Sequence, residues 1–419
     1  MEAKPGDLNW NLNAPSGMTH RFARIRRFRF NRPQRIAAGL LALFLLQGLW
    51  LTAHQTLSDR DYQYARCGRE VWERPSGLAG YYTTCGNIHD GILVYRLAGL
   101  PLTLNFELER ALDHFRKPED RVIQVAGELS PWELRHQITH VLLLLRLPFL
   151  FAGCALGGGL WWVTRRIYGN LGGYTALSLY CFCPPILRAC VTPSAEVLAA
   201  LAVYGGAYTC IGVAHAMQGP RRKWRPRIVL LAFAFGMGAA SHIAALPVVA
   251  LLGLFAMLWV AEGRRAQVLP IVLIAVAGAL VLLFACYGFS PDAFSYVFRS
   301  AAGFLSVSID PARRFFASLP NAGISIAAAA ALLLYLAFRR SRYFGNTAPL
   351  LCFLVVVLLV MTGAPGSPWL WAIPFLLTFI AGVFSDAYES PRGRLALAAG
   401  GAVVALQVVF CVLSLAGLL

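Results

Sequence analysis

The stretch "IVLLAFAFGMGAASHIAALPVVALLGLFAMLWVA", residues 228–261, decides the fold class, because it runs for 34 residues without a charged side chain. As one helix it would be about 51 Å long, whereas a hydrocarbon core is roughly 30 Å thick. Basic clusters flank both of its ends, "RRKWRPR" at 221–227 and Arg264-Arg265, and basic residues collect on the cytoplasmic side. The stretch is therefore predicted to form a membrane hairpin that turns near residues 239–247, with Pro247 helping the turn.

The composition of the whole chain supports a membrane protein. The chain has 419 residues, of which 58% are hydrophobic and 14% are charged, and its mean hydropathy is +0.60. Uncharged runs of about 17–20 residues recur, and this length is enough to cross a bilayer as a helix. A membrane barrel would instead show short alternating strands. The sequence thus predicts an all-α polytopic membrane protein.

Eleven membrane-spanning helices are predicted. They cover residues 36–53, 147–164, 171–187, 197–218, 228–243, 245–261, 267–287, 321–338, 347–364, 368–385 and 395–417. The chain is predicted to divide into a basic cytoplasmic segment (1–35), the first crossing (36–53), an extracytoplasmic loop (54–135), crossings two to seven (136–287), a second outer loop (288–320) and crossings eight to eleven (321–419). The N-terminus is then cytoplasmic and the C-terminus extracytoplasmic.

The net charge of +17 is interpreted as a topology signal rather than as nucleic-acid binding, since the basic residues cluster beside the crossings. The run "RFARIRRFRFNRPQR" precedes the first crossing, and contact with anionic lipid headgroups stays open for it. No small-residue cleavage site follows the first apolar run, so a cleaved signal peptide is not predicted.

The first outer loop, 54–135, is the main soluble part and holds twelve of the twenty acidic residues. Two surface helices are predicted here. One lies in "DYQYARCGREVWER" (61–74), and the other lies in "PWELRHQITHVLLLLRLPFL" (131–150) and runs into the second crossing. Pro131 after Ser130 is a helix start signal.

Cysteines and histidines give few signals of chemistry. Eight of the ten cysteines lie in or beside apolar runs, where a thiol behaves as a small buried hydrophobe. Cys67 and Cys85 both lie in the outer loop, and an oxidising compartment would join them in a disulfide. His136 and His140 are four residues apart, but no third metal ligand has matching spacing, so no metal site is predicted. No cofactor motif is present, and a need for a divalent metal stays open.

Ionisable side chains in or beside the crossings are candidates for chemistry, because burying them in a membrane is costly. By the predicted topology six of them gather near the outer face: Asp59, Asp61, Arg146, Arg188, Glu196 and His242. Acids together with cations suit a reaction in which an acid activates a hydroxyl and cations hold a phosphate. For each residue alone, the alternative is a snorkelling or helix-end charge.

Several motifs follow one another in a characteristic order. "SDRDYQYA" (58–65) follows the first crossing, and "GNIHDGILVYRLAGLPL" (86–102) contains His89 and Asp90. The longest stretch, 146–204, has Arg-x-Pro near its start, a basic pair, and an acid opening the fourth crossing. "FGMGAASHIAALP" and "PGSPWLWAIPFLLTFIAG" come later. This order, over roughly residues 35–385, resembles the GT-C membrane glycosyltransferases, which include protein O-mannosyltransferases and aminoarabinose transferases.

The resemblance implies a GT-C-like fold and transfer of a sugar from a polyprenyl-phosphate donor to an unidentified acceptor on the outer face. We expect the bacterial cytoplasmic (inner) membrane and a lipid as partner. The resemblance also implies roles for individual residues. Asp59 and Asp61 would be catalytic, Arg146, Arg188 and His242 would bind the donor phosphate, and Tyr62, His89, Asp90 and Glu196 would line the cavity.

The chain departs from the family pattern at four places. Arg60 follows Asp59 where a second acid is usual, "HDGI" replaces His-Pro-Pro-Leu, His242 stands where many members have Lys, and "WLW" (369–371) replaces Arg-Tyr. These departures favour an alternative, a catalytically inactive scaffold or accessory subunit that binds membrane protein partners. A secondary transporter is less favoured, because neither paired halves nor matched broken helices are evident.

Overall fold

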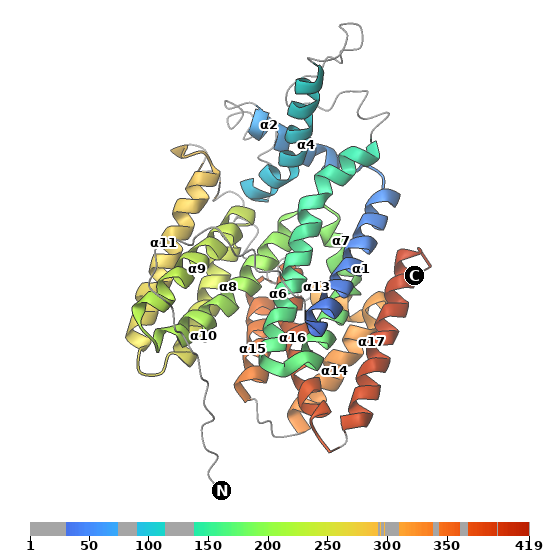
Figure 1. Ribbon diagram of the computed structural model, residues 1–419, viewed down its shortest axis with the longest axis vertical. Helices are drawn as coiled ribbons and strands as arrows, with labels where there is room; N and C mark the ends of the chain where they lie inside the picture. The colour runs from blue at the N-terminus through green and yellow to red at the C-terminus, as the bar shows by residue number, and fades with distance from the viewer. Residues whose placement is uncertain are drawn as a thin grey trace, which may run out of the picture.

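The computed structural model describes residues 31–73, 90–113, 138–291, 294, 297, 310–337, 343–360, 368–391 and 393–418. Every regular element within these ranges is a helix, which confirms the predicted all-α class. The long helices form one bundle, and α2 and α4 lie at one end of it (Figure 1). The helices are α1 (Arg32–His54), α2 (Asp59–Glu73), α4 (Ile92–Asp113), α6 (Ile138–Cys181), α7 (Pro184–Cys190), α8 (Ala195–Met217), α9 (Arg221–Ser241), α10 (Ala245–Val260), η3 (Arg265–Gln267), α11 (Val268–Cys286), α13 (Asp310–Ala317), η5 (Leu319–Asn321), α14 (Ala322–Ala337), α15 (Tyr343–Val360), η6 (Pro368–Trp371), α16 (Ile373–Tyr388) and α17 (Gly393–Leu415).

Seven helical segments of the described chain are long and apolar enough to cross a membrane, and α10 and part of α15 are shorter apolar helices. The chain is therefore a multi-pass membrane protein. Helices lie in each of the eleven intervals where crossings are predicted, although α9 carries its basic residues within its first turns. The number of crossings stays a prediction.

Helix α6 is in fact two helices joined at Gly169. This glycine has φ +80°, a conformation that residues with a Cβ rarely adopt. Tyr180 donates a hydrogen bond of 2.6 Å to the carbonyl of Gly153, so the chain has turned back on itself between them. The two halves correspond to the predicted second and third crossings.

The predicted hairpin within residues 228–261 is observed. Helix α9 ends at Ser241 and α10 begins at Ala245. His242 between them has extended backbone angles, and its N–H donates to the carbonyl of Gly238 at 2.9 Å. The turn therefore falls inside the predicted range of 239–247, with Pro247 in the first turn of α10.

Helices α2 and α4 form an outer element through a close backbone crossing. A Cβ placed on Gly99 would overlap the backbone of Gly68, and the reverse is also true. Beside the crossing, Arg69 and Glu73 form a buried ion pair of 2.7 Å, which Thr103 extends with a 3.1 Å hydrogen bond to Glu73. The helix predicted over 61–74 is thus α2, while the helix start predicted at Pro131 lies outside the described residues.

The outer element binds the ends of two bundle helices. The N–H of Gly91 donates to the carbonyl of Ser241 at the end of α9, at 2.6 Å. Arg96 Nε donates to the carbonyl of Cys286 at the end of α11, at 2.8 Å. The last carbonyls of a helix have no partner within that helix, so these bonds both cap the helices and dock the outer element.

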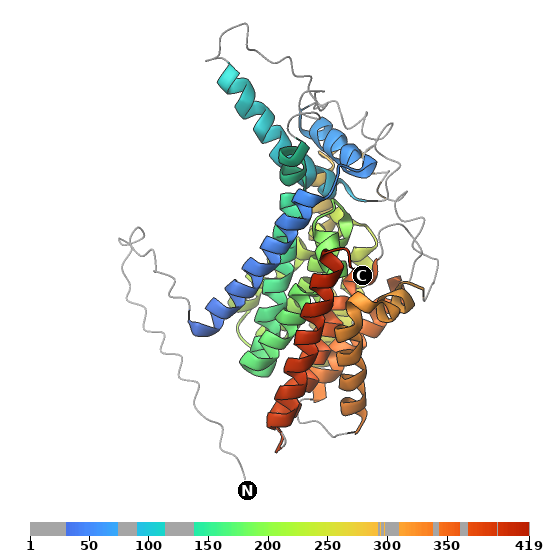
Figure 2. The ribbon, with the colours of Figure 1, turned by 90° about the vertical axis from the view of Figure 1, so that its right-hand side faces the viewer.

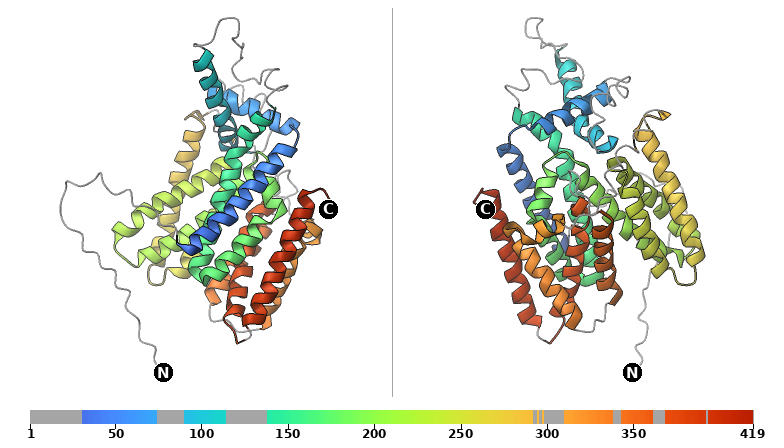
Figure 3. Two further views of the ribbon diagram at one scale, coloured as in Figure 1. Left: turned by 45° about the vertical axis from the view of Figure 1, so that its right-hand side comes forward. Right: turned by 180° about the vertical axis from the view of Figure 1, so that it is seen from behind.

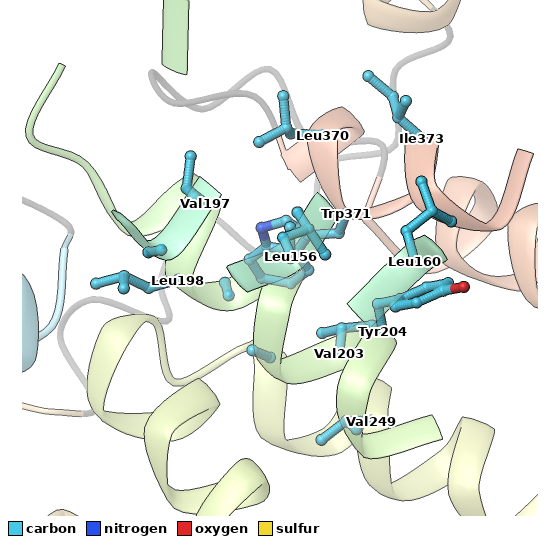
Figure 4. Close-up of a cluster of buried hydrophobic side chains, with 14 of the residues drawn as sticks. Leu156, Leu160, Val197, Leu198, Val203, Tyr204, Val249, Leu370, Trp371 and Ile373 are labelled. Carbon is cyan, nitrogen blue, oxygen red and sulfur yellow. The ribbon is translucent and has the colours of Figure 1, made fainter. Parts of the chain in front are cut away.

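Large side chains fill the centre of the bundle. Figure 4 shows Trp371 of η6 among side chains of α6, α8 and α10, including Leu156 and Val249, all of them buried. At the other side of the bundle, Gln407 of α17 is fully buried. Its Nε2 donates to the carbonyls of Phe182 and Pro320 at 2.8 and 2.9 Å, and its Oε1 accepts from the N–H of Ile324 at 3.1 Å.

The close crossing of the outer element predicts that Gly99→Ala is destabilising. Because the neighbour is backbone rather than a flexible side chain, the two helices must separate, and overpacking of this kind costs about 1–3 kcal/mol. The thermal unfolding midpoint of the protein in detergent should fall. Gly205→Ala in α8 is the matched control, since a Cβ there meets nothing within 4 Å, and its midpoint should hold or rise. Equal midpoints for both variants would contradict the packing described.

Candidate functional site

The site begins where the chain leaves α1 and enters α2. The Ser58 hydroxyl accepts the backbone N–H of Asp61 at 3.1 Å, and the Asp61 carboxylate accepts the backbone N–H of Ser58 at 3.2 Å. The Ser58 hydroxyl also donates to the same carboxylate at 2.8 Å. This reciprocal arrangement is a capping box, which satisfies two N–H groups at a helix start. It fixes the first turn of α2 directly after the apolar α1.

Asp61 forms a buried ion pair with Arg146 of α6. Arg146 Nη2 lies 2.7 Å from Asp61 Oδ2, and both side chains are 3% exposed. Arg146 Nη1 also donates to Gln55 Oε1 at 3.1 Å, while its Nε is buried and has no hydrogen-bond partner among the described residues. A buried charge needs such a partner, because removing either ion from water costs several kcal/mol. The pair therefore joins the end of α1, the start of α2 and α6.

Asp90 forms a second polar cluster, between α2 and the start of α8. Its Oδ2 accepts hydrogen bonds from the Tyr64 hydroxyl and from the backbone N–H of Ala195, the latter at 3.2 Å. Arg60 Nη2 lies 3.6 Å from the same oxygen and 3.4 Å from the Tyr64 hydroxyl. Burial, and after it the negative charge of Asp90, raises the pKa of Tyr64 well above its ordinary value. Tyr64 is therefore a neutral phenol that donates to Asp90.

The other predicted outer-face residues lie around these clusters. Asp59, the first residue of α2, is exposed, and no ion pair within 4.0 Å joins it to another described residue. Tyr62 is half-buried one turn after Ser58. Glu196 is half-buried in the first turn of α8, beside Ala195, and its charge acts on Arg60.

The three predicted phosphate ligands contact different elements. Arg146 contacts α1 and α2, as described above. Arg188 is exposed on α7 and donates to the Ser414 hydroxyl of α17 at 2.9 Å. The ring of His242 meets the indole of Trp371 edge-on, with centroids 5.7 Å apart. Gly91, which follows Asp90, is hydrogen-bonded to Ser241, which precedes His242. His242 therefore lies close to the chain at Asp90, although the two residues are far apart in the sequence.

Only some of the cysteines and histidines named in the predictions lie among the residues that the structure describes. Cys67 is disulfide-bonded, and its predicted partner Cys85 lies outside the described residues. His89 and His136 also lie outside them, while His140 is exposed at the start of α6. In the part of the chain that the structure describes, no group of three or more His, Cys, Asp or Glu side chains could hold a metal ion.

Four residues of the two clusters are missed by the sequence reasoning: Gln55, Ser58, Arg60 and Tyr64. The S-x-x-D spacing of Ser58 and Asp61 is a capping-box signal, and the spacing of Arg60 and Tyr64 places them on one helical face. Both signals lie within the motif "SDRDYQYA" (58–65) that follows the first crossing. Gln55 has no such signal, because its partner Arg146 is 91 residues away.

No protein-family model, curated protein sequence or solved structure matches the chain. The resemblance to GT-C enzymes therefore rests on the order of motifs in the sequence.

The buried ion pair predicts strong coupling between Asp61 and Arg146. Arg146→Met leaves a buried carboxylate without its cation, so the free energy of unfolding should fall by about 3–5 kcal/mol. Asp61→Asn in the same chain removes the orphaned charge, so the double variant should be more stable than Arg146→Met alone. Denaturant unfolding in detergent measures both. Arg110→Met, which breaks an exposed 3.8 Å pair with Glu107, is the control and should change stability little. Losses that simply add would argue against a coupled pair.

Proposed function

We propose that the chain is a membrane glycosyltransferase that moves a sugar from a polyprenyl-phosphate donor to an acceptor hydroxyl on the extracytoplasmic face. The observation that supports it is the contact between Asp61 and Arg146. These residues are 85 positions apart in the sequence, yet they pack together at the end of the bundle that carries the outer element. The resemblance expects an acid-bearing segment and a cationic helix start to share one cavity at this place.

The proposal includes a topology of eleven crossings in the bacterial inner membrane, with a cytoplasmic N-terminus and an extracytoplasmic C-terminus. Helices α1 and α17 both run toward the end of the bundle that carries α2 and α4 (Figure 2), which supports placing that end outside. The division of α6 at Gly169 and the turn at His242 support counting each of those segments as a pair of crossings.

Asp59 is the best candidate for the general base. Its carboxylate is exposed at the start of α2, two residues from the buried Asp61. The Asp61 carboxylate, by contrast, already accepts from Arg146 and Ser58. In the proposed reaction Asp59 takes the proton of the acceptor hydroxyl, the acceptor oxygen bonds to the sugar carbon, and the bond to the donor phosphate oxygen breaks.

Arg146 is then a positioning residue, since both of its Nη groups are bound to Asp61 and Gln55. It holds the start of α2, and hence Asp59, against α6. Arg188 and His242 are the remaining proposed ligands of the donor phosphate, whose negative charge grows as the bond to the sugar breaks. The Asp90 cluster lies beside the start of α2 as well, because its members Arg60 and Tyr64 belong to that helix.

Asp59→Asn should abolish transfer without unfolding the protein. Loss of a general base costs about 10²–10⁴ in rate, while an exposed carboxylate contributes little to stability. Release of polyprenyl phosphate from a panel of polyprenyl-phosphate sugars in vesicles measures transfer, and native mass spectrometry checks that lipid still binds. Glu70→Gln is the matched control, a carboxylate on the same helix without a proposed role, and should keep the wild-type rate. Full activity of Asp59→Asn would remove Asp59 from the mechanism.

A catalytically inactive scaffold or accessory subunit is the second candidate. It is favoured by the contacts of the arginine side chains near the candidate site. Arg146 neutralises Asp61, Arg188 binds Ser414, and Arg60 pairs with Asp90, so each has a structural partner. Native mass spectrometry of the gently purified protein separates the two functions. Polyprenyl-phosphate adducts on a monomer support the enzyme, and partner proteins in a fixed ratio without such adducts support the scaffold.

A further inference from the structure

The Asp90 carboxylate lies in a set of groups that bind anions. One oxygen, Oδ2, faces the Tyr64 hydroxyl, the Ala195 N–H and the Arg60 guanidinium. Ala195 is the first residue of α8, a helix of 23 residues, and the start of such a helix carries partial positive charge with N–H groups that have no partner inside the helix. A guanidinium and a helix start together form a typical environment for phosphate.

A second observation points to a ligand larger than one carboxylate oxygen. Ser194 is the N-cap residue of α8 and is only 3% exposed, yet its hydroxyl has no hydrogen-bond partner among the described residues. An N-cap hydroxyl ordinarily accepts a helix N–H, and a buried hydroxyl without a partner destabilises the fold. As the N-cap residue, Ser194 carries this hydroxyl at the same helix end that Asp90 binds.

We propose that Arg60, Tyr64, Ser194 and the Ala195 N–H form an anion subsite for a phosphate group, and that the Asp90 carboxylate is its internal occupant. The inference deepens the proposed function and rests on it where it assigns this phosphate to the lipid donor, in which case these groups hold the phosphate in place of Arg188 and His242. A phosphate oxygen replaces Asp90 Oδ2 against Arg60 and Ala195, and a second oxygen accepts the Ser194 hydroxyl. The carboxylate thus competes directly with the ligand.

The backbone geometry allows this exchange with little movement. Gly91, next to Asp90, is held by its N–H bond to Ser241, and a Cβ on it would overlap the backbone of Ala240. The chain at Asp90 therefore stays in place while the side chain rotates out. Glu196 keeps a negative charge near Arg60, so a phosphate competes with Asp90 against a residual repulsion.

Asp90→Asn tests the subsite directly. The amide keeps an oxygen for Ala195 and Tyr64 but removes the competing charge, and charges at close range in a protein interact strongly. Calorimetric titration of the full-length protein in detergent with inorganic phosphate should give a Kd at least about tenfold lower than that of the wild type. Adding Arg60→Gln to the Asp90→Asn chain should remove this gain. Glu70→Gln is the matched control, because it changes the net charge equally on the same helix and has no proposed role.

The outcomes are distinct. A gain in Asp90→Asn alone, lost with Arg60→Gln, supports the subsite. No gain, or an equal gain in Glu70→Gln, overturns it. Should Asp90→Asn fail to fold, modification of wild-type Arg60 by phenylglyoxal takes its place. Phosphate should slow that modification more than chloride at equal ionic strength, and equal rates overturn the subsite.

Competition identifies the source of the phosphate and separates this inference from the proposed function. Displacement of inorganic phosphate by polyprenyl phosphate but not by phosphatidic acid supports the subsite as a donor site, and displacement by both supports it as a general lipid-phosphate site. Phosphate binding without sugar transfer retains the subsite and rejects the transferase. Transfer by the wild type without phosphate binding at Arg60 retains the transferase and overturns the subsite.

Discussion

The ion pair of Asp61 and Arg146 determines where the outer element meets the membrane bundle. Neither charge can stay buried without the other, so the start of α2 has to lie against α6 wherever the chain after α1 leads. The direction of α2 then places Arg60 and Tyr64 toward Asp90, and the crossing of Gly68 with Gly99 places α4 on α2. One set of contacts therefore holds the polar residues of α2, Asp90 and the start of α8 in place, rather than leaving them on separate loops.

The same region also provides hydrogen-bond partners for backbone groups at the ends of the bundle helices. Ends of membrane helices leave carbonyl and N–H groups without partners, and an apolar environment offers no water for them. Gly91, Arg96 and Asp90 bind the ends of α9, α11 and α8 respectively. The outer element is thus attached to three helices of the bundle (Figure 3), and a shift of any one of them has to move it or break one of these hydrogen bonds.

The sequence predicts much of this fold because membrane crossing leaves a local signal. Apolar runs and basic flanks predict the helical intervals and the turn at His242, while no local pattern predicts the crossing of Gly68 with Gly99, which depends on a segment 31 residues away. The candidate site follows the same rule. Asp61, Arg146 and Glu196 stand out as charges near crossings, and Asp90 through the motif that contains it, but charge alone does not show that Asp61 and Arg146 neutralise each other. Arg60 and Tyr64 become visible only when α2 is known to face Asp90.

Gln407 has a consequence for the order of assembly. It is the fully buried amide of α17, and its three hydrogen bonds go to Phe182, Pro320 and Ile324, all of which precede it in the chain. A chain made from its N-terminus presents those partners before Gln407 is synthesised. Until α17 docks, the amide lies in lipid without partners, and unpaired polar groups there are costly. Gln407 can form its three hydrogen bonds only after the chain that follows α6 and the start of α14 have reached their final positions. Stable docking of α17 in the membrane therefore depends on the correct placement of these earlier segments.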